Sequence, residues 1–251
     1  MIMLIFMNAS LNSPWLYTQV LLSSFFQMSD MHSSIISVKT VGYSHEKRPI
    51  QLVSLTQNSS SVSQRKAIFV ECGIHSSEWI SPAFCLYLMN KLVETKKSKG
   101  PLNYFDFYLI PLVNPDGLNY SWKNLRLWRK NRRPHNCTGI TPQKSYPDYL
   151  KECDIILYPH DGTDCYGIDL NRNFDSNFAT NNKGENKTVI QIKFVLNSYF
   201  PDNSINSEVS HEGSDNIYSY TYHGTEPFSE PETKAVKLAI DYIIQDHGSE
   251  K

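Results

Sequence analysis

The sequence has no apolar run of the roughly 20 residues that a membrane-spanning helix needs. It also lacks an excess of either charge, because 24 Lys and Arg side chains stand against 25 Asp and Glu. A balanced charge gives no reason to expect a nucleic-acid partner, and no internal repeat is visible. Membrane and nucleic-acid-binding proteins are therefore not predicted. A length of 251 residues with 40% apolar side chains is enough for one large domain or two small ones.

Charge is entirely missing from the start of the chain, where Asp30 is the first ionised side chain. Met1–Met7 is apolar, but it lacks the basic segment that opens a secretory signal peptide. We leave residues 1–14 as an unassigned N-terminal segment. After Pro14, polar side chains recur every four residues through Trp15–Met28, opposite an apolar face. This period predicts an amphipathic helix.

Cysteine is scarce and odd in number, with five in the chain. We expect Cys72, in a strand, and Cys85, in a helix, to be small buried apolar side chains. Cys137, Cys153 and Cys165 share one irregular region and are enough for one disulfide. Asn-X-Ser/Thr tripeptides favour a secreted protein in an oxidising compartment. They begin at Asn8, Asn58, Asn119, Asn136 and Asn186.

The most informative stretch is an apolar strand, a glycine, and then a histidine and a glutamate three residues apart. Ala67–Cys72 is an apolar run apart from Glu71, which predicts a central strand covered on both faces. His75 and Glu78 follow where a helix begins, and the i,i+3 spacing lets them face one point. An imidazole and a carboxylate are two of the three ligands of a His2Glu zinc site. The alternative is a surface histidine beside a helix-starting glutamate, because His223 and His247 also have Glu three residues on.

The remaining pattern alternates strands and helices. Ile35–Val41 and Pro49–Leu55 predict two strands joined by a polar turn. Phe105–Val113 predicts another strand, closed by an Asn-Pro-Asp-Gly turn. Helices are predicted after Glu78, with Pro82 in the first turn, and after Ser229. The apolar stripe expected for the second consists of Val236, Ala239, Ile240, Ile243 and Ile244. We therefore expect an α/β fold with a mixed sheet and helices on both faces.

Two polar segments can bind an anion. Leu125–Arg133 is rich in Arg and Lys, and Tyr166–Phe174 looks like a short strand ending in Asn171 and Arg172. Guanidinium groups bind carboxylates in a bidentate manner. The plainer interpretations are a solvated basic loop for the first segment and loop-stabilising polar contacts for the second.

Taken in order, these motifs resemble the zinc metallocarboxypeptidases of the carboxypeptidase A/B type. The matching segments are Gly73-Ile74-His75-x-x-Glu78-Trp79, Asn114-Pro115-Asp116-Gly117, Arg126-Leu127-Trp128-Arg129-Lys130, Asp169-x-Asn171-Arg172-Asn173-Phe174, Tyr222-His223-Gly224 and Ser229-Glu230-x-Glu232. The resemblance runs from about Trp15 to Gly248. It implies a partial catalytic domain over residues 15–251, with insertions near 134–164 and 176–218.

The resemblance implies roles for single residues. His75 and Glu78 correspond to zinc ligands, and Asp169 corresponds to the carboxylate that orients the zinc-bound histidine. Arg129 corresponds to the arginine that polarises the scissile carbonyl group. The terminal carboxylate of the substrate would be bound by Asn171, Arg172 and the auxiliary Arg126. The implied cofactor is Zn²⁺, the implied partners are peptide or protein C-termini, and the implied protein is a secreted monomer.

The chain also departs from the family pattern. The third zinc ligand, a histidine in a His-Ser-Tyr-like strand, and the catalytic glutamate are not found, so we expect a domain incomplete at its C-terminal side and little activity. Ser77 stands where the family usually has an arginine. Cys165 matches one half of a family disulfide whose other position, near Tyr218, is not cysteine, so pairing with Cys137 or Cys153 is the alternative. Two other functions remain open: a carboxylate-binding protein without catalysis, and a zinc amidohydrolase of the aspartoacylase type.

Overall fold

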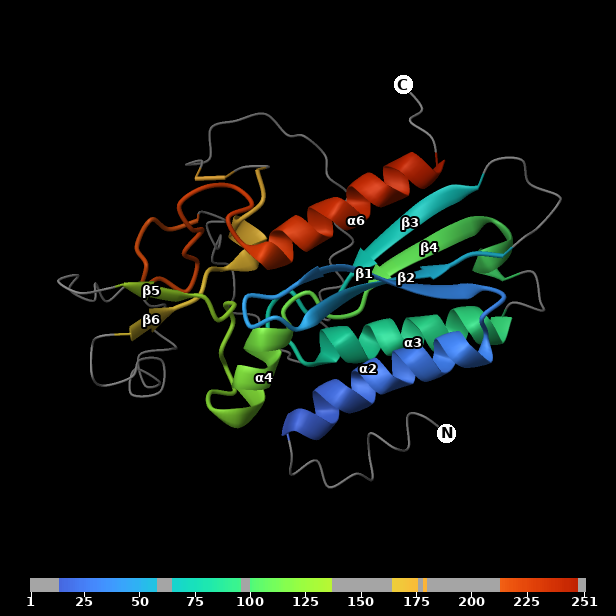
Figure 1. Ribbon diagram of the computed structural model, residues 1–251, viewed down its shortest axis with the longest axis horizontal. Helices are drawn as coiled ribbons and strands as arrows, with labels where there is room; N and C mark the ends of the chain where they lie inside the picture. Colours follow the sequence, from blue (N-terminus) through green and yellow to red (C-terminus); the bar gives the residue numbers. More distant parts are fainter. Residues whose placement is uncertain are drawn as a thin grey trace, which may run out of the picture.

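The computed structural model describes residues 14–57, 65–95, 100–136, 164–175, 178–179 and 213–247. Their centre is a four-stranded sheet with the strand order β1-β2-β4-β3 (Figure 1). The strands are β1 (Ile36–Tyr43), β2 (Pro49–Leu55), β3 (Lys66–Glu71) and β4 (Phe105–Ile110). β1, β2 and β4 pair antiparallel, whereas β3 pairs with β4 in parallel. The mixed sheet expected from the sequence is confirmed.

Helices cover both faces of this sheet (Figure 1). α2 (Pro14–Met31) and α3 (Ile80–Glu94) lie on one face, and α6 (Pro231–His247) lies on the other. Two separate apolar clusters fill the layers between sheet and helices. Neighbouring side chains of β3 divide between them, since Ile68 and Val70 pack with the first and Phe69 with the second. This alternation explains why the strand reads as one apolar run.

The sequence predicted that β3 is a central strand, but the structure places it elsewhere. Among the described residues it lies at the edge of the sheet, and the interior, largely buried strands are β2 and β4. The side chains of β3 are only half-buried or exposed. The apolar run reports that both faces are covered by helices, but it carries no information on how many strands lie beside it. That prediction was therefore wrong for a physical reason.

Both long terminal helices bury the faces that hold apolar side chains. In α2, Phe25 and Met28 are buried against the first cluster. In α6, the buried members of the expected stripe are Val236, Ala239 and Ile243. Ile240 and Ile244 are exposed by 38% and 51%, so the stripe is narrower than expected. None of the helices within the described ranges has the length and apolar character required to cross a bilayer.

Several short elements follow β4 and hold the polar segments. Asn114 begins a helix rather than closing a simple turn, because its Oδ1 accepts a hydrogen bond from Gly117 N and Pro115 takes the first helical position. This helix is α4 (Pro115–Lys123), and a short 3-10 turn, η2 (Pro101–Asn103), precedes β4. The ends of the expected 134–164 insertion pair as a ribbon of β5 (Pro134–Asn136) and β6 (Asp164–Tyr166). The rest of that insertion, and almost all of 176–218, lies outside the described residues.

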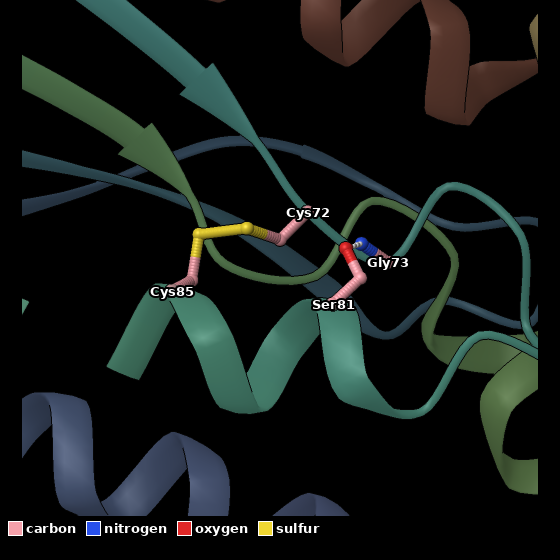
Figure 2. The surroundings of a disulfide bond; sticks show 4 residues. All are labelled: Cys72, Gly73, Ser81 and Cys85. Carbon is pink, nitrogen blue, oxygen red and sulfur yellow. Dashed lines mark hydrogen bonds between the residues drawn. A yellow bond between two sulfur atoms is a disulfide. The ribbon is translucent and has the colours of Figure 1, made fainter. Parts of the chain in front are cut away.

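Cys72 and Cys85 form a disulfide, which corrects the expectation of two unpaired apolar side chains. The bond joins the residue after β3 to the second turn of α3 (Figure 2). Both residues are buried in the first apolar cluster, so their burial was foreseen but their bonding was not. Cys165 is also disulfide-bonded. Its candidate partners, Cys137 and Cys153, lie outside the described residues.

Candidate metal and carboxylate-binding site

The turn after β3 is fixed by contacts with the loop after β4. Gly73 has φ +66°, and a Cβ atom there would lie 2.7 Å from Leu112 Cδ1. Its carbonyl oxygen accepts a hydrogen bond from Asn114 N, and Asn114 Nδ2 donates to Ile74 O. Glycine is therefore required here for both conformation and space. These contacts fix the backbone of Gly73 and Ile74, which leads to His75.

His75 lies between two carboxylates. Its Nδ1 is 3.0 Å from Glu78 Oε1, and its Nε2 is 3.2 Å from Asp169 Oδ1. Burial lowers the pKa of His75, but hydrogen bonds with Asp169 and Glu78 outweigh it, so the net shift is upward. An ionised carboxylate only accepts hydrogen bonds, so Asp169 keeps a proton on Nε2. In the neutral imidazole, the Nδ1 lone pair then faces Glu78, which is the donor arrangement that zinc requires.

Asp169 connects the parts of the site. This fully buried carboxylate accepts from His75, from Arg129 Nε at 3.0 Å and from Asn171 N at 3.1 Å. Burial alone would raise its pKa, but the charge of Arg129 and the bond to His75 hold that pKa well below its usual range. Asp169 is thus ionised at neutral pH. The Asp169 side chain thus links His75, the Arg129 guanidinium and the backbone of Asn171, which come from three separate segments of the chain.

Arg129 lies beside the His75–Glu78 pair. Its NH1 is 3.9 Å from Glu78 Oε1, and its guanidinium lies 5.3 Å from the centre of the Tyr220 ring. Ser76 donates to the backbone of this segment, from N to Arg129 O and from Oγ to Trp128 O at 2.5 Å. The Arg129 guanidinium therefore places positive charge next to the two potential metal ligands, His75 and Glu78.

Lys130 and Arg132 of the basic segment turn inward although Arg126 is exposed, so the segment is not simply a solvated loop. Lys130 is 7% exposed, and its Nζ donates to the carbonyl oxygens of Ile217 and Ser219. Burial lowers the pKa of Lys130 to about 7. The guanidinium of Arg132 stacks 3.6 Å from the ring centre of Tyr120. These two side chains make structural contacts within the protein, and Lys130 binds the backbone of the segment that carries Tyr220.

Asn171 and Arg172 lie in a 3-10 turn, η4 (Leu170–Arg172), and not at the end of a strand as expected. Asp169 caps this turn by accepting from Asn171 N. Arg172 NH1 donates to Asn171 O at 3.1 Å, whereas its buried Nε has no hydrogen-bond partner. A buried donor without a partner is costly in free energy. The turn therefore places an amide and a partly unsatisfied guanidinium next to the carboxylate that orients His75.

Arg126 occupies the outer side of the site. Its NH1 donates to Ser77 O at 2.7 Å, and its guanidinium lies 3.8 Å from the Trp79 ring centre. Trp79 in turn stacks on Trp122, with ring centres 3.9 Å apart. The structure thus brings six of the predicted residues together through Asp169 and its neighbours. Arg126 lies on the exposed rim, where it contacts Ser77 and Trp79, the two residues that flank Glu78.

Sequence reasoning missed two side chains, Glu71 beside His75 and Tyr220 beside Arg129. Glu71, the last residue of β3, has its carboxyl pKa raised to about 7 by burial, against the opposing effect of the His75 charge. Its polarity at the end of an apolar strand was the available signal. Tyr220 had no local signal, because Lys130 places it from a distant segment. Within the described residues, no group of three or more His, Cys, Asp or Glu side chains is arranged to hold a metal ion.

Comparison with known proteins defines the class. The sequence profile of the zinc carboxypeptidases matches residues 21–247. Carboxypeptidase O of Homo sapiens is 30% identical over 219 residues, 86% of this chain and 43% of that protein. Carboxypeptidase B2 of Homo sapiens is 31% identical over 214 residues, 83% of this chain and 37% of that protein. The chain belongs to the zinc carboxypeptidase family.

Solved structures agree with this assignment. Bovine thrombin-activatable fibrinolysis inhibitor, in complex with tick carboxypeptidase inhibitor, gives a TM-score of 0.57 at 28% identity. That match covers 90% of this chain and 55% of the other. A crystal structure of thrombin-activatable fibrinolysis inhibitor gives 0.58 at 26% identity, covering 91% and 43%. The α/β carboxypeptidase fold is therefore shown, and the chain spans about half the length or less of the relatives that it matches.

Proposed function

We propose that this chain carries the zinc- and carboxylate-binding part of a metallocarboxypeptidase that removes the C-terminal residue of peptides. The observation that carries the proposal is the position of Asp169, which is bonded to His75, Arg129 and the Asn171 backbone. His75 Nδ1 and Glu78 Oε1 would hold the zinc ion, since they converge at 3.0 Å and the tautomer of the imidazole is fixed by Asp169. Bound zinc supplies a Lewis acid that polarises a carbonyl group and activates water.

The chain's own residues supply the charge for the reaction. Arg129 is held by Asp169 through Nε, which leaves its terminal nitrogens near Glu78 to stabilise negative charge on a carbonyl oxygen. Asn171 and Arg172 would bind the terminal carboxylate, and the partnerless Nε of Arg172 is a donor available for it. Only a chain end presents a free carboxylate, so this pair would restrict cleavage to the C-terminus.

A binding measurement tests this assignment. Titration calorimetry of the zinc-loaded protein compares a short peptide carrying a free C-terminal carboxylate with its C-terminal amide. We expect saturable binding of the acid, at least tenfold weaker binding of the amide, and loss of this preference in Arg172→Gln. Lys237→Gln is the control, because it removes a positive charge that pairs with Asp241 on the exposed side of α6. Equal binding of acid and amide by the unaltered protein would contradict the proposal.

A second candidate is carboxylate binding without hydrolysis. It is favoured by one observation: within the described residues, no third His, Cys, Asp or Glu joins His75 and Glu78 in a group that could hold a metal ion. Release of the C-terminal residue from a reporter peptide separates the two functions. Chelator-sensitive release supports the enzyme, whereas carboxylate-dependent binding with no release supports the binding protein. Cleavage of small N-acyl amino acids in preference to peptides would instead indicate an amidohydrolase of the aspartoacylase type.

Cysteine bonding supports an extracellular location. Cys72–Cys85 and a further bond to Cys165 imply oxidation during folding, and stable disulfides form mainly in secreted proteins. We therefore propose secretion, and a monomer acting on peptide or protein C-termini. Mass measurement of the secreted protein before and after alkylation in denaturant would count its free thiols and test this point.

A further inference from the structure

The Cys72–Cys85 disulfide encloses both potential zinc ligands. His75 and Glu78 lie inside the 13-residue separation that the bond closes. On one side Cys72 is paired with the sheet, donating from N to Ile110 O and accepting from Val113 N. On the other side Cys85 lies in α3, which begins two residues after Glu78. The bond therefore ties the helix that follows the ligands to the strand that precedes them (Figure 2).

The two ligands are anchored differently. His75 is buried, and Asp169 fixes its Nε2 independently of α3. The Glu78 side chain is 52% exposed, and its described contacts are with His75 Nδ1 at 3.0 Å and Arg129 NH1 at 3.9 Å. The first of these contacts is the one that a metal ion would replace. Without it, the position of the Glu78 carboxylate depends on where α3 begins.

We propose that the Cys72–Cys85 disulfide is a positioning element for zinc binding, and that it acts on Glu78 through the start of α3. This inference rests on the proposed function of His75 and Glu78 as zinc ligands. A parallel hydrogen bond supports it, since Gly73 N donates to Ser81 Oγ at 2.9 Å across the same junction (Figure 2). The strand end is thus joined twice to the first two turns of α3, by a hydrogen bond to Ser81 and covalently to Cys85.

Burial makes this bond a permanent constraint. Cys85 is 0% exposed and Cys72 is 3% exposed, and both pack in the apolar cluster beneath the sheet. A dissolved thiol has no access to either sulfur in the folded protein. The test must therefore replace the pair and not rely on a reductant. Alanine is the suitable replacement, because a free thiol or a serine hydroxyl would add a new polar group or metal ligand.

The experiment measures zinc affinity and thermal stability of the full chain with the double substitution Cys72→Ala and Cys85→Ala. We expect zinc binding to weaken about tenfold, as for other groups that hold metal ligands in place. Val236→Ala is the matched control, because Val236 is 2% exposed in α6 on the other face of the sheet. This control should lower the melting temperature while leaving zinc affinity unchanged within twofold.

A second background separates positioning of Glu78 from general loosening. In Glu78→Ala, zinc binding can be followed by the NMR shifts of the His75 ring, and removal of the disulfide should change that affinity by less than twofold. A loss as large as in the unaltered background would overturn the inference. If the double alanine chain does not fold, Ser81→Ala tests the same junction with the disulfide intact. It should weaken zinc binding by less than the double substitution, and unchanged affinity would count against the inference.

The proposed function and the role of the disulfide can be refuted separately. Absence of saturable zinc binding by the unaltered protein would refute the proposed function. Equal zinc affinity of the unaltered and double alanine proteins would refute only the role of the disulfide.

Discussion

Asp169→Asn is the most informative single substitution in this site. The carboxylate accepts three hydrogen bonds, from His75 Nε2, Arg129 Nε and Asn171 N, at 3.0–3.2 Å. An asparagine has one oxygen and one NH2 group, so at least one of these donors would face another donor. If the amide nitrogen turns toward His75, the proton moves to Nδ1 and blocks the lone pair that faces Glu78.

The magnitude follows from these contacts. Loss of a group that orients a metal-bound histidine weakens metal binding by about 10–100-fold, which is about 1.4–2.8 kcal/mol. Stability should fall as well, because removing one partner of a buried ion pair costs about 3–5 kcal/mol. Arg129 retains 16% of its side-chain exposure, so the lower end is expected. At about 2–4 °C per kcal/mol, the melting temperature should fall by roughly 6–12 °C.

Asp116→Asn is the matched control. Asp116 is also fully buried, accepting from Ser44 Oγ at 2.6 Å and pairing with Arg48 at 2.5 Å, but it contacts none of the candidate zinc ligands. It should lose stability to a similar extent and keep its zinc affinity. Calorimetric zinc titration and thermal unfolding measured on both variants give the comparison. Unchanged zinc affinity in Asp169→Asn, or an equal loss in Asp116→Asn, would refute the assigned role of Asp169.

Three further outcomes are expected. Gly73→Ala should destabilise the fold by about 1–3 kcal/mol in denaturant unfolding, because φ is +66° and the added Cβ meets Leu112. Burial raises the pKa of Glu232 from 4.5 to about 7, so its ionisation opposes folding, and stability should decrease as pH rises between these values. Glu232→Gln should flatten that dependence, at a cost in stability at low pH because its NH2 group would face His45 N or Asn131 Nδ2; an unchanged profile of urea midpoint against pH would contradict this. Arg126→Ala should leave the melting temperature within about 2 °C, since exposed side chains contribute little to stability.

Patterns local in the chain were sufficient for much of the fold. The apolar residues of Pro49–Leu55 predicted a strand and the four-residue period after Pro14 predicted a helix, and both elements are present. The His75–Glu78 pair was also predictable, because three residues along a turn determine which side chains face each other. The role of Asp169 came from family resemblance, since it is 94 residues from His75 and no spacing rule connects them.

Only the tertiary structure decided the remaining features. An apolar run reports coverage by helices, so it could not show that β3 lies at the edge of the sheet. Cys72 and Cys85 read as buried, but whether their sulfur atoms meet depends on how α3 packs against the strand. Tyr220 reaches Arg129 from a distant segment, whose backbone just before Tyr220 is held by buried Lys130. Burial, periodicity and short-range pairing are properties of the local sequence, whereas strand neighbours, disulfide bonding and long-range contacts depend on packing between elements.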